Sequence, residues 1–357
     1  MNTVTAISLF SGAGGDTLGM YKAGVNVLGF VEFQKDAINT HKHNFPDCKM
    51  IGEDISKIPD NVFQNYTDRV DIIFGGFPCQ SFSHGGKKDA NDKRGALYKE
   101  FIRCARIIQP KIIIGENVKG ILSRKGPDGN PILETILQEF TDIGYNMKYN
   151  LFNLKKYGIP QDRERVIIYG IRSDLDIDFN LANIELESPR FNRDIIEKSL
   201  ERSLWIQKKE ILKKIPEHCY LNIEDRESKI TLEPPTNLIK CYNKGELSFK
   251  KRSKSTYGCI IDLNDVSRTI LSTYSRMPRL FVPVKVSSSE LCYLRPYTVL
   301  ELQRIQGFPD SFVFKGNYTA QVTQIGNAIA PMFVEKIMNY ILGILSGDIL
   351  EVSQLVE

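Results

Sequence analysis

The segment that decides the fold reads DIIFGGFPCQSFS and spans residues 71–83. Its apolar start predicts a short buried strand, which the glycine pair at 75–76 ends. Pro78 fixes its own φ and biases Phe77 away from helix, so the thiol of Cys79 is held on a stiff turn. Open α/β sheets bind ligands at the carboxyl ends of their strands, and we therefore expect Cys79 at a functional site. Taken alone, the segment is equally compatible with a loop cysteine that has no role.

Around this segment, apolar runs alternate with amphipathic stretches through the first 170 residues. This alternation predicts an α/β fold with a doubly wound, mostly parallel sheet and helices on both faces. The runs expected to form strands are 4–9, 27–31, 71–74, 111–115, 146–152 and 166–171, and the stretches expected to form helices are 16–23, 35–44, 96–108 and 132–143.

The composition and the hydrophobic pattern of the sequence change near residue 173. Residues 173–265 are richer in Lys, Glu, Asn and Ser, have no strand–helix rhythm, and contain Pro234-Pro235. Helical patterns return at 298–306 and 328–345. We therefore predict a core at 1–172, a smaller separate module at 173–285, and a segment at 286–357 that returns to the core.

Composition narrows the class of protein. No run of about 18 apolar residues is present, and the chain begins with a predicted strand and not with a basic signal region, so we expect no membrane span and no secretion. The seven cysteines include no CxxC pair, and the four histidines have no metal-ligand spacing. We expect a cytoplasmic protein without a metal site.

Positive charge is concentrated in two stretches. Residues 240–279 hold nine Lys or Arg against three acids, and residues 81–96 hold four against two. Aromatic residues interleave with the first stretch, as in surfaces that bind a phosphate backbone. A merely solvated charged face is the alternative.

A glycine-rich turn, FSGAGG at residues 10–15, follows the first predicted strand and opens a helix. Such a turn lets the backbone approach a ligand closely, although many α/β proteins use one only for packing. Glu32 ends the second predicted strand and suits two ribose hydroxyls, while Asp54 ends the third and suits an adenine amino group. The pattern predicts an adenosine-containing cofactor without separating NAD from S-adenosyl-L-methionine; a helix cap or a solvated acid is the alternative for each carboxylate.

Two further segments carry candidate chemistry. Glu116 lies at the tip of the buried run 111–115, where an apolar setting raises a carboxyl pKa. In QDRER, residues 161–165, the period-two spacing puts Gln161, Arg163 and Arg165 on one side of a strand, so two guanidinium groups can face one site. A loop acid in water and ion-paired surface arginines are the alternatives.

Together these segments resemble the C5-cytosine DNA methyltransferases. The blocks occur in the family's order: FSGAGG, GGFPCQSFS, Glu-Asn-Val at 116–118, QxRxR, RxxTxxExxRIQGFP at 295–309, and QxGNA at 324–328. They lie within residues 4–171 and about 268–345. Tyr297 and Ala330 depart from the common pattern, but neither is expected to touch a reacting group.

The resemblance implies covalent catalysis on a cytosine flipped out of double-stranded DNA. Cys79 would add to C6 of the base, Glu116 would hold N3 and N4, and Arg165 would hold O2 with Arg163 nearby. Pro78 would orient the cysteine. The fold implied is a Rossmann-like, S-adenosyl-L-methionine-dependent core with a smaller target-recognition domain, and the product is S-adenosyl-L-homocysteine.

The resemblance also assigns the remaining segments. Residues 81–96 correspond to a mobile loop that closes over DNA, and 173–285 to the target-recognition domain. The implied cofactor contacts are Phe10, Gly12, Gly14, Glu32, Phe33, Asp54, Ile55, Leu97 and Asn327.

The compact chain is typical of a monomeric bacterial restriction–modification enzyme, with a cognate endonuclease that shares its target. Three other functions are alternatives. An RNA cytosine-5 methyltransferase shares the fold, a silent DNA-binding regulator is expected to have lost Cys79 or Glu116, and an NAD-dependent oxidoreductase shares only the glycine-rich turn and Glu32.

Overall fold

The computed structural model describes residues 3–78, 97–126, 129–207, 209–224, 233–251, 254, 257–286 and 291–347. The chain divides into two compact units. The first unit comprises residues 1–154, 164–186 and 328–357, and the second comprises 155–163 and 187–327.

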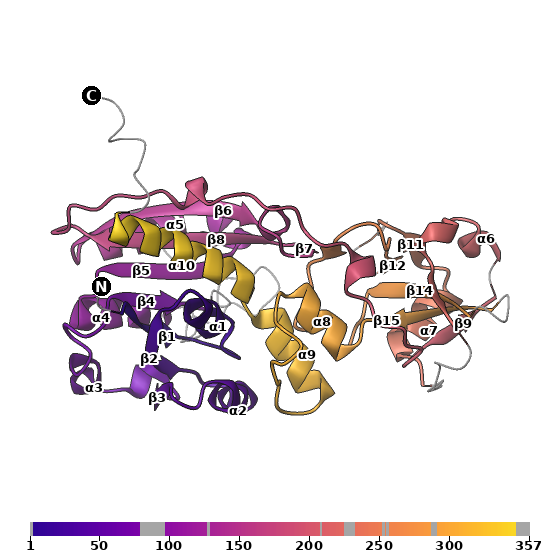
Figure 1. Ribbon diagram of the computed structural model, residues 1–357, viewed down its shortest axis with the longest axis horizontal. Coiled ribbons are helices and arrows are strands. Elements are labelled where there is room, and N and C mark those ends of the chain that lie inside the picture. Colours follow the sequence, from indigo (N-terminus) through magenta and orange to yellow (C-terminus); the bar gives the residue numbers. More distant parts are fainter. Residues whose placement is uncertain are drawn as a thin grey trace, which may run out of the picture. The chain divides into compact units, whose positions relative to one another are not determined.

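The first unit is built on a seven-stranded sheet with the order β3-β2-β1-β4-β5-β8-β6 (Figure 1). Strands β3, β2, β1, β4 and β5 are parallel, and β8 runs antiparallel to both β5 and β6. This order confirms the predicted doubly wound, mostly parallel sheet. The strand bounds are β1 Thr5–Leu9, β2 Asn26–Val31, β3 Lys49–Gly52, β4 Ile72–Gly75, β5 Ile112–Val118, β6 Tyr145–Asn153 and β8 Glu164–Arg172.

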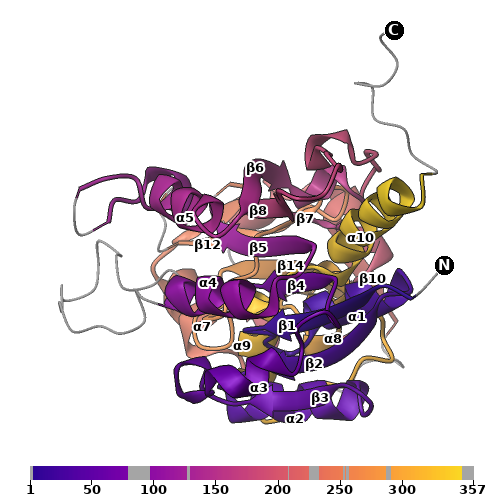
Figure 2. The ribbon, with the colours of Figure 1, turned by 90° about the vertical axis from the view of Figure 1, so that its left-hand side faces the viewer.

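Helices pack on this sheet through a large apolar core in which Phe101 and Phe140 meet Ile73 and Ile113. The helices of the first unit are α1 Gly15–Lys22, α2 Lys35–Asn44, α3 Asp60–Gln64, α4 Leu97–Ile108, α5 Ile132–Thr141 and α10 Pro331–Ser346. Figure 2 views the unit with α4 and α5 toward the reader.

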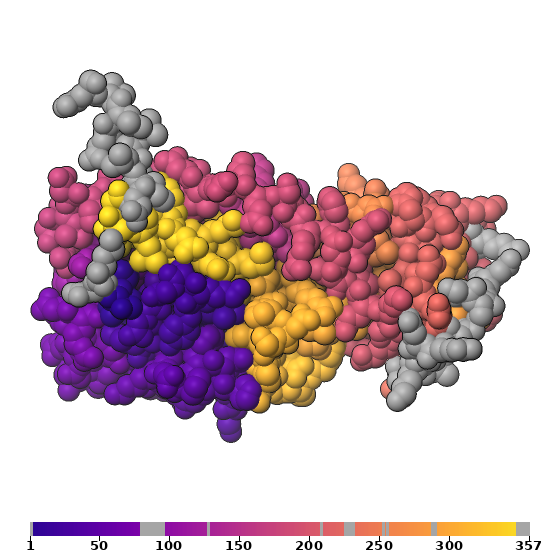
Figure 3. Space-filling view, viewed as in Figure 1, coloured from indigo at the N-terminus to yellow at the C-terminus, as the bar shows by residue number. Residues whose placement is uncertain are grey.

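The C-terminal helix α10 returns to the first unit and packs on α1. A Cβ added to Gly19 would lie 2.5 Å from the Pro331 carbonyl oxygen, so only glycine permits this close approach. The helix begins at Pro331 and not at the predicted residue 328, because proline suits the first helical turn. In Figure 3 the yellow C-terminal residues accordingly lie directly against the indigo N-terminal residues.

The stretch Tyr318–Ser346 is long and apolar enough, by length and composition alone, to cross a membrane. Half of its most apolar window is buried inside the protein, and residues 328–330 separate it into α9 and α10. The inner face of α10 buries Phe333, Ile337 and Ile341. A core helix passes the same test, so this stretch is weak evidence for a membrane span.

The second unit is built around a sheet with the order β11-β12-β14-β15-β9, and β10 also pairs with β14. A separate two-stranded pair joins β7 and β13. The strands are β7 Gln161–Asp162, β9 Leu204–Ile206, β10 Leu221–Ile223, β11 Leu247–Phe249, β12 Gly258–Ile260, β13 Ser267–Arg268, β14 Leu280–Val286 and β15 Cys292–Pro296; the helices are α6 Lys209–Leu212, α7 Thr236–Asn243, α8 Val299–Ile305 and α9 Tyr318–Asn327.

The bounds of the second unit differ from the predicted module at 173–285. The segment 173–186 stays with the first unit, whereas 155–163 and 286–327 belong to the second. The physical reason is pairing: β15 adds to β14 inside the second sheet, and β7 pairs with β13. The β14–β15 pairing joins consecutive strands, whereas the β7–β13 pairing joins segments far apart in the chain and has no local signature in the sequence.

Candidate active site

Glu116 and Arg165 form an ion pair at one end of the first sheet. They lie on the adjacent antiparallel strands β5 and β8, where Val118 is opposite Arg165 and Glu116 is opposite Ile167. Arg165 Nε lies 2.7 Å from Glu116 Oε1, and the two side chains are 11% and 13% exposed. Arg165 Nη1 also donates to the Glu164 carbonyl oxygen at 2.7 Å. The pair is therefore held close to the surface and not sealed in the core.

The loop that leads to Cys79 is fixed beside this pair. The Asn117 amide donates to the Phe77 carbonyl oxygen at 3.0 Å, and Phe77 itself is buried. A Cβ placed on Gly76 would lie 3.6 Å from Glu116 Oε2, so the backbone before Pro78 passes next to the carboxylate. Cys79 and the loop 81–96 lie outside the described residues. The structure thus brings Pro78, the residue before the predicted nucleophile, into the neighbourhood of Glu116 and Arg165.

Arg163 occupies a different environment from Arg165. Its side chain is 1% exposed and belongs to the second unit. Nη1 donates to the Ile270 carbonyl oxygen at 3.2 Å, and Nη2 donates to the Gly326 carbonyl oxygen at 3.1 Å. These contacts give Arg163 a structural task, and its predicted place beside the substrate stays a prediction.

The glycine-rich turn joins β1 to α1 and has an open face. Phe10 and Gly12 both adopt the left-handed backbone conformation, with φ of 58° and 55°. A Cβ on Gly12 would meet no atom within 4 Å, whereas one on Gly14 would lie 2.5 Å from the Phe45 ring. Gly14 is therefore explained by packing, while Gly12 leaves room for a ligand. The buried hydroxyl of Ser11 has no hydrogen-bond partner among the described residues.

Glu32 closes the other side of this turn. Its carboxylate accepts hydrogen bonds from the backbone N–H groups of Gly12 at 2.8 Å and Gln34 at 2.7 Å. Burial raises the pKa of Glu32, and these N–H bonds oppose that shift. Phe33 follows with 70% of its surface exposed, although a side chain of this kind is usually buried. An open glycine turn, an unpartnered buried hydroxyl and an anchored carboxylate fit an adenosine-containing cofactor.

The other predicted cofactor residues are distributed over both units. The Asp54 carboxylate caps a short 3-10 helix by accepting from the Ser56 N–H at 3.1 Å, and its bonds with Ser56 hold its pKa below the usual value. Ile55 is buried, and Leu97 packs on the same core cluster. Asn327 is exposed at the end of α9 in the second unit. Their cofactor contacts remain predictions.

A buried polar cluster beneath the glycine turn was missed from the sequence. The Ser8 hydroxyl donates to the Asp16 carboxylate, and Thr17 Oγ1 lies 3.0 Å from His41 Nε2. Burial raises the pKa of Asp16 to about 6 and lowers the pKa of His41 to about 3. A signal was available: Asp16 is the first polar residue after the glycines, where a helix N-terminus favours an acid.

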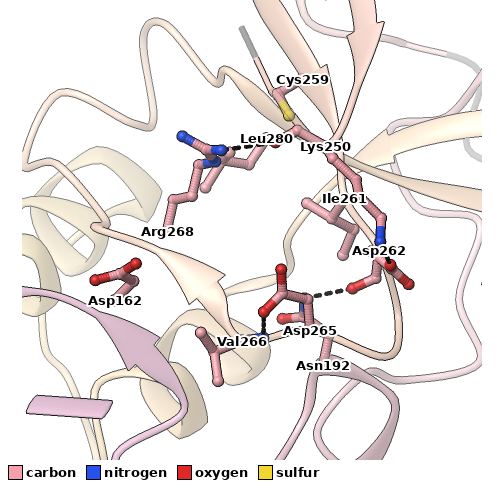
Figure 4. A pocket seen from close by; sticks show the side chains of 10 residues that line it. All are labelled: Asp162, Asn192, Lys250, Cys259, Ile261, Asp262, Asp265, Val266, Arg268 and Leu280. Atoms are coloured by element: carbon pink, nitrogen blue, oxygen red, sulfur yellow. Dashed lines mark hydrogen bonds and ion pairs between the residues drawn. The ribbon is translucent and has the colours of Figure 1, made fainter. Parts of the chain in front are cut away.

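The second unit contains a polar pocket lined from several loops (Figure 4). The Arg268 guanidinium donates to the Lys250 carbonyl oxygen at 2.8 Å, and the Lys250 ammonium pairs with the buried Asp262. The pocket is lined by Asp162, Asn192, Lys250, Cys259, Ile261, Asp262, Asp265, Val266, Arg268 and Leu280. It offers both cationic and acidic groups to a polar ligand.

Next to this pocket, two neighbouring residues of the chain, His218 and Cys219, come together with the distant Asp262. Potential ligand atoms of His218, Cys219 and Asp262 lie within 4.8 Å of one another. The Cys219 thiol donates to Asp262 Oδ1 at 2.9 Å, and burial followed by this bond raises the pKa of Cys219 to about 11. A protonated thiol is a poor metal ligand, and Lys250 already balances the carboxylate.

Comparison with known proteins identifies the family of this chain. Residues 4–343 match the family model of the C-5 cytosine-specific DNA methylases. The type II methyltransferase M.Eco47II of Escherichia coli is 33% identical over 92% of this chain and 76% of its own length, and M.Sau96I of Staphylococcus aureus is 31% identical over 90% and 71%. A candidate DNA modification methyltransferase from an Escherichia coli prophage superposes with a TM-score of 0.68 and 25% identity, covering 96% of this chain and 100% of that one. The chain therefore belongs to the family of C-5 cytosine-specific DNA methylases.

Proposed function

We propose that this enzyme methylates C5 of a cytosine within one short sequence of double-stranded DNA, by covalent catalysis through Cys79. The observation that carries the proposal is the Glu116–Arg165 pair, 2.7 Å apart on neighbouring strands and flanked by the anchored loop that leads to Pro78. A carboxyl and a guanidinium side by side match the N3, N4 and O2 edge of a cytosine.

In this mechanism the Cys79 thiolate forms a bond to C6, and the electron pair of the C5–C6 double bond becomes available at C5. Glu116 hydrogen-bonds N3 and N4 and stabilises the charge that moves onto the ring, while Arg165 binds O2. C5 takes up the methyl group, then loses its proton to a base as the bond to Cys79 breaks. The product is 5-methylcytosine, and the thiolate is regenerated.

S-adenosyl-L-methionine is the proposed cofactor, and it supplies an electrophilic methyl group on a sulfonium. Glu32 would accept hydrogen bonds from the ribose hydroxyls of the cofactor. Gly12, which has no side chain, would leave room for the cofactor beside the turn. Phe10, Phe33, Asp54, Ile55, Leu97 and Asn327 complete the proposed contacts, and Gly14 acts through packing. S-adenosyl-L-homocysteine is the product released.

The second unit is the proposed target-recognition domain, with its basic stretch and polar pocket contacting DNA. We further propose that this protein is a bacterial, cytoplasmic enzyme that acts as a monomer, and that it has the restriction–modification role of its type II relatives. An endonuclease gene beside this one, cutting the same sequence, would support that role, and a locus without one would count against it.

Bisulfite sequencing of DNA from a methylation-deficient bacterial host tests the proposal. Expression of the chain is expected to methylate cytosines in one short motif, and Cys79→Ser is expected to abolish this while preserving the bound cofactor. The proposal would be refuted if a folded, cofactor-binding protein left no methylated cytosines in the DNA. Substantial methylation by Cys79→Ser would also refute it.

A further inference from the structure

The chain passes between the two units four times, at 154/155, 163/164, 186/187 and 327/328. Two of these crossings flank predicted site residues. Arg165 follows the crossing at 163/164 by one residue, and Asn327 is the last residue before the crossing at 327/328. The contacts that hold each crossing within the second unit can therefore affect the positions of Arg165 and Asn327.

The crossings at 154/155 and 186/187 are held to each other by backbone. Tyr157 and Glu187 form a parallel bridge. The Gly158 N–H donates to the Glu187 carbonyl oxygen at 3.0 Å, and the Glu187 N–H donates to the Lys156 carbonyl oxygen at 2.8 Å. Gly158 has a φ of 86°, and a Cβ there would lie 2.8 Å from the Glu187 carboxyl carbon. The positive φ favours glycine here, whereas the flexible Glu187 side chain could move away from a Cβ.

The other two crossings are held to each other by one side chain, Arg163. This buried guanidinium bonds to the Gly326 carbonyl, two residues before the chain leaves the second unit at 327/328. It bonds at the same time to the Ile270 carbonyl, next to the β7–β13 pairing. A Cβ on Gly326 would lie 2.5 Å from the Ser272 nitrogen, so the end of α9 is in close contact with the same segment.

We call the contacts of Arg163 with the Ile270 and Gly326 carbonyls the clasp, and Gln161 adds hydrogen bonds to it. Its Nε2 donates to Gln306 Oε1 at 2.7 Å, and its Oε1 accepts from the Ile270 N–H at 3.0 Å. The Thr269 hydroxyl donates to the Asp162 carbonyl oxygen at 2.7 Å. Three consecutive residues before the crossing are thus hydrogen-bonded into the second unit, whereas Arg165, two residues later, contacts Glu116.

We infer that Arg163 is a positioning residue, which couples the second unit to the catalytic pair by clasping the crossings at 163/164 and 327/328. The inference deepens the proposed function and rests on it. With the clasp intact, residues 163, 270 and 326 move as one body. β8 begins at Glu164, directly after Arg163, so a change in how the second unit is held, for example by its DNA target, can reach Arg165 through one intervening residue.

The test compares Arg163→Met, which removes both hydrogen bonds, with Arg163→Lys, which keeps the charge and can retain one. Arg106→Met, at an exposed position on α4, is the matched control. Single-turnover methyl transfer is measured at saturating DNA and S-adenosyl-L-methionine, on the target sequence and on a duplex with one altered base pair. Cofactor binding, DNA binding and thermal unfolding are measured on the same samples.

Arg163→Met is expected to slow transfer to the target about 100-fold, the effect of a misplacement of about 1 Å at a reacting group. Discrimination against the altered duplex is expected to fall about tenfold, with cofactor affinity unchanged and Arg163→Lys intermediate. The inference would be overturned if folded Arg163→Met transferred methyl at the wild-type rate. It would also be overturned if the rate fell only because cofactor binding was lost, with discrimination between the two duplexes intact. If Arg163→Met fails to fold, Arg163→Lys decides by the same two readouts. Failure of the wild-type protein to methylate DNA would instead refute the proposed function.

Discussion

Each unit contains an arginine–glutamate pair, and the two pairs are built differently. Arg295 and Glu301 in the second unit are both 0% exposed, with Nη2 2.6 Å from Oε1. All five donors of Arg295 are bonded, two to Glu301 and three to the carbonyls of Ser199, Pro296 and Glu197. Glu301 also accepts from the backbone N–H groups of Glu197 and Thr298.

The Glu116–Arg165 pair of the first unit lacks this saturation. Both side chains retain some exposure, and the Nε–H of Arg165 makes no hydrogen bond with a described residue although Nε is 2.7 Å from Oε1. A carboxylate has about four acceptor sites and a guanidinium has five donors. In the second unit, where every donor of Arg295 is bonded, the arginine–glutamate pair is a structural element. In the first unit, where hydrogen-bonding positions remain, the pair is a candidate for binding a polar base.

Removing the carboxylate charge of the first pair should give the largest effect. Glu116→Gln is expected to lower the rate of methyl transfer about 1000-fold, within the range for a lost general acid or base, and to leave the unfolding temperature nearly unchanged. The rate is measured with labelled methyl donor on the target duplex. The control is Glu164→Gln on β8, which removes a more exposed ion pair with Lys119. Equal loss in both variants would show that the pair has no special role.

Breaking the Arg295–Glu301 pair should lower the unfolding free energy and should not directly change the rate of methyl transfer. Glu301→Gln leaves the buried Arg295 charge without its counter-ion, at an expected cost of about 3–5 kcal/mol in unfolding free energy. Urea unfolding measures the change. Asp310→Asn is the matched control, because it breaks the more exposed Arg304–Asp310 pair and should cost less than about 1 kcal/mol. A small effect of Glu301→Gln would contradict the assignment of this pair as structural.

The buried His41, whose Nε2 lies within hydrogen-bonding distance of Thr17, extends the comparison to pH. Because the pKa of His41 is about 3 in the folded chain against an ordinary value of 6.5, the folded state binds fewer protons between these values. Its contribution to stability is present above pH 6.5 and is lost as pH falls. Asp16, with a pKa of about 6, acts in the opposite direction, since its contribution is lost as pH rises through 6.

His41→Gln should therefore reduce the loss of unfolding free energy between pH 7.5 and pH 5.5 by about 1 kcal/mol relative to the wild type. Urea unfolding at the two pH values gives the difference. His43→Gln, at an exposed position on the same helix, should leave the pH dependence as in the wild type. Parallel pH dependence in wild type and His41→Gln would contradict the pKa assigned to His41.

The sequence predicted the first sheet well because its strands are continuous apolar runs whose signal is local. The runs 111–115 and 166–171 became β5 and β8, but β5 extends to Val118, so Glu116 lies within that strand and not at its tip. The second sheet was missed: β9 to β12 are three residues long each, too short for periodicity to distinguish from loop. The predicted boundary at 285 differs from the bounds of the second unit because β15 pairs with the preceding strand β14 and continues the second sheet to residue 296.

Sequence alone determined the fold class and the family resemblance, and it named the candidate site residues, since motif chemistry depends on residue type and spacing. Tertiary structure decided what each of those residues touches. Arg163 and Arg165 are two positions apart in one motif, yet one bonds backbone carbonyls in the second unit and the other pairs with Glu116. The reason is that the partners of a guanidinium are set by long-range strand pairing, between β7 and β13 for one and between β5 and β8 for the other.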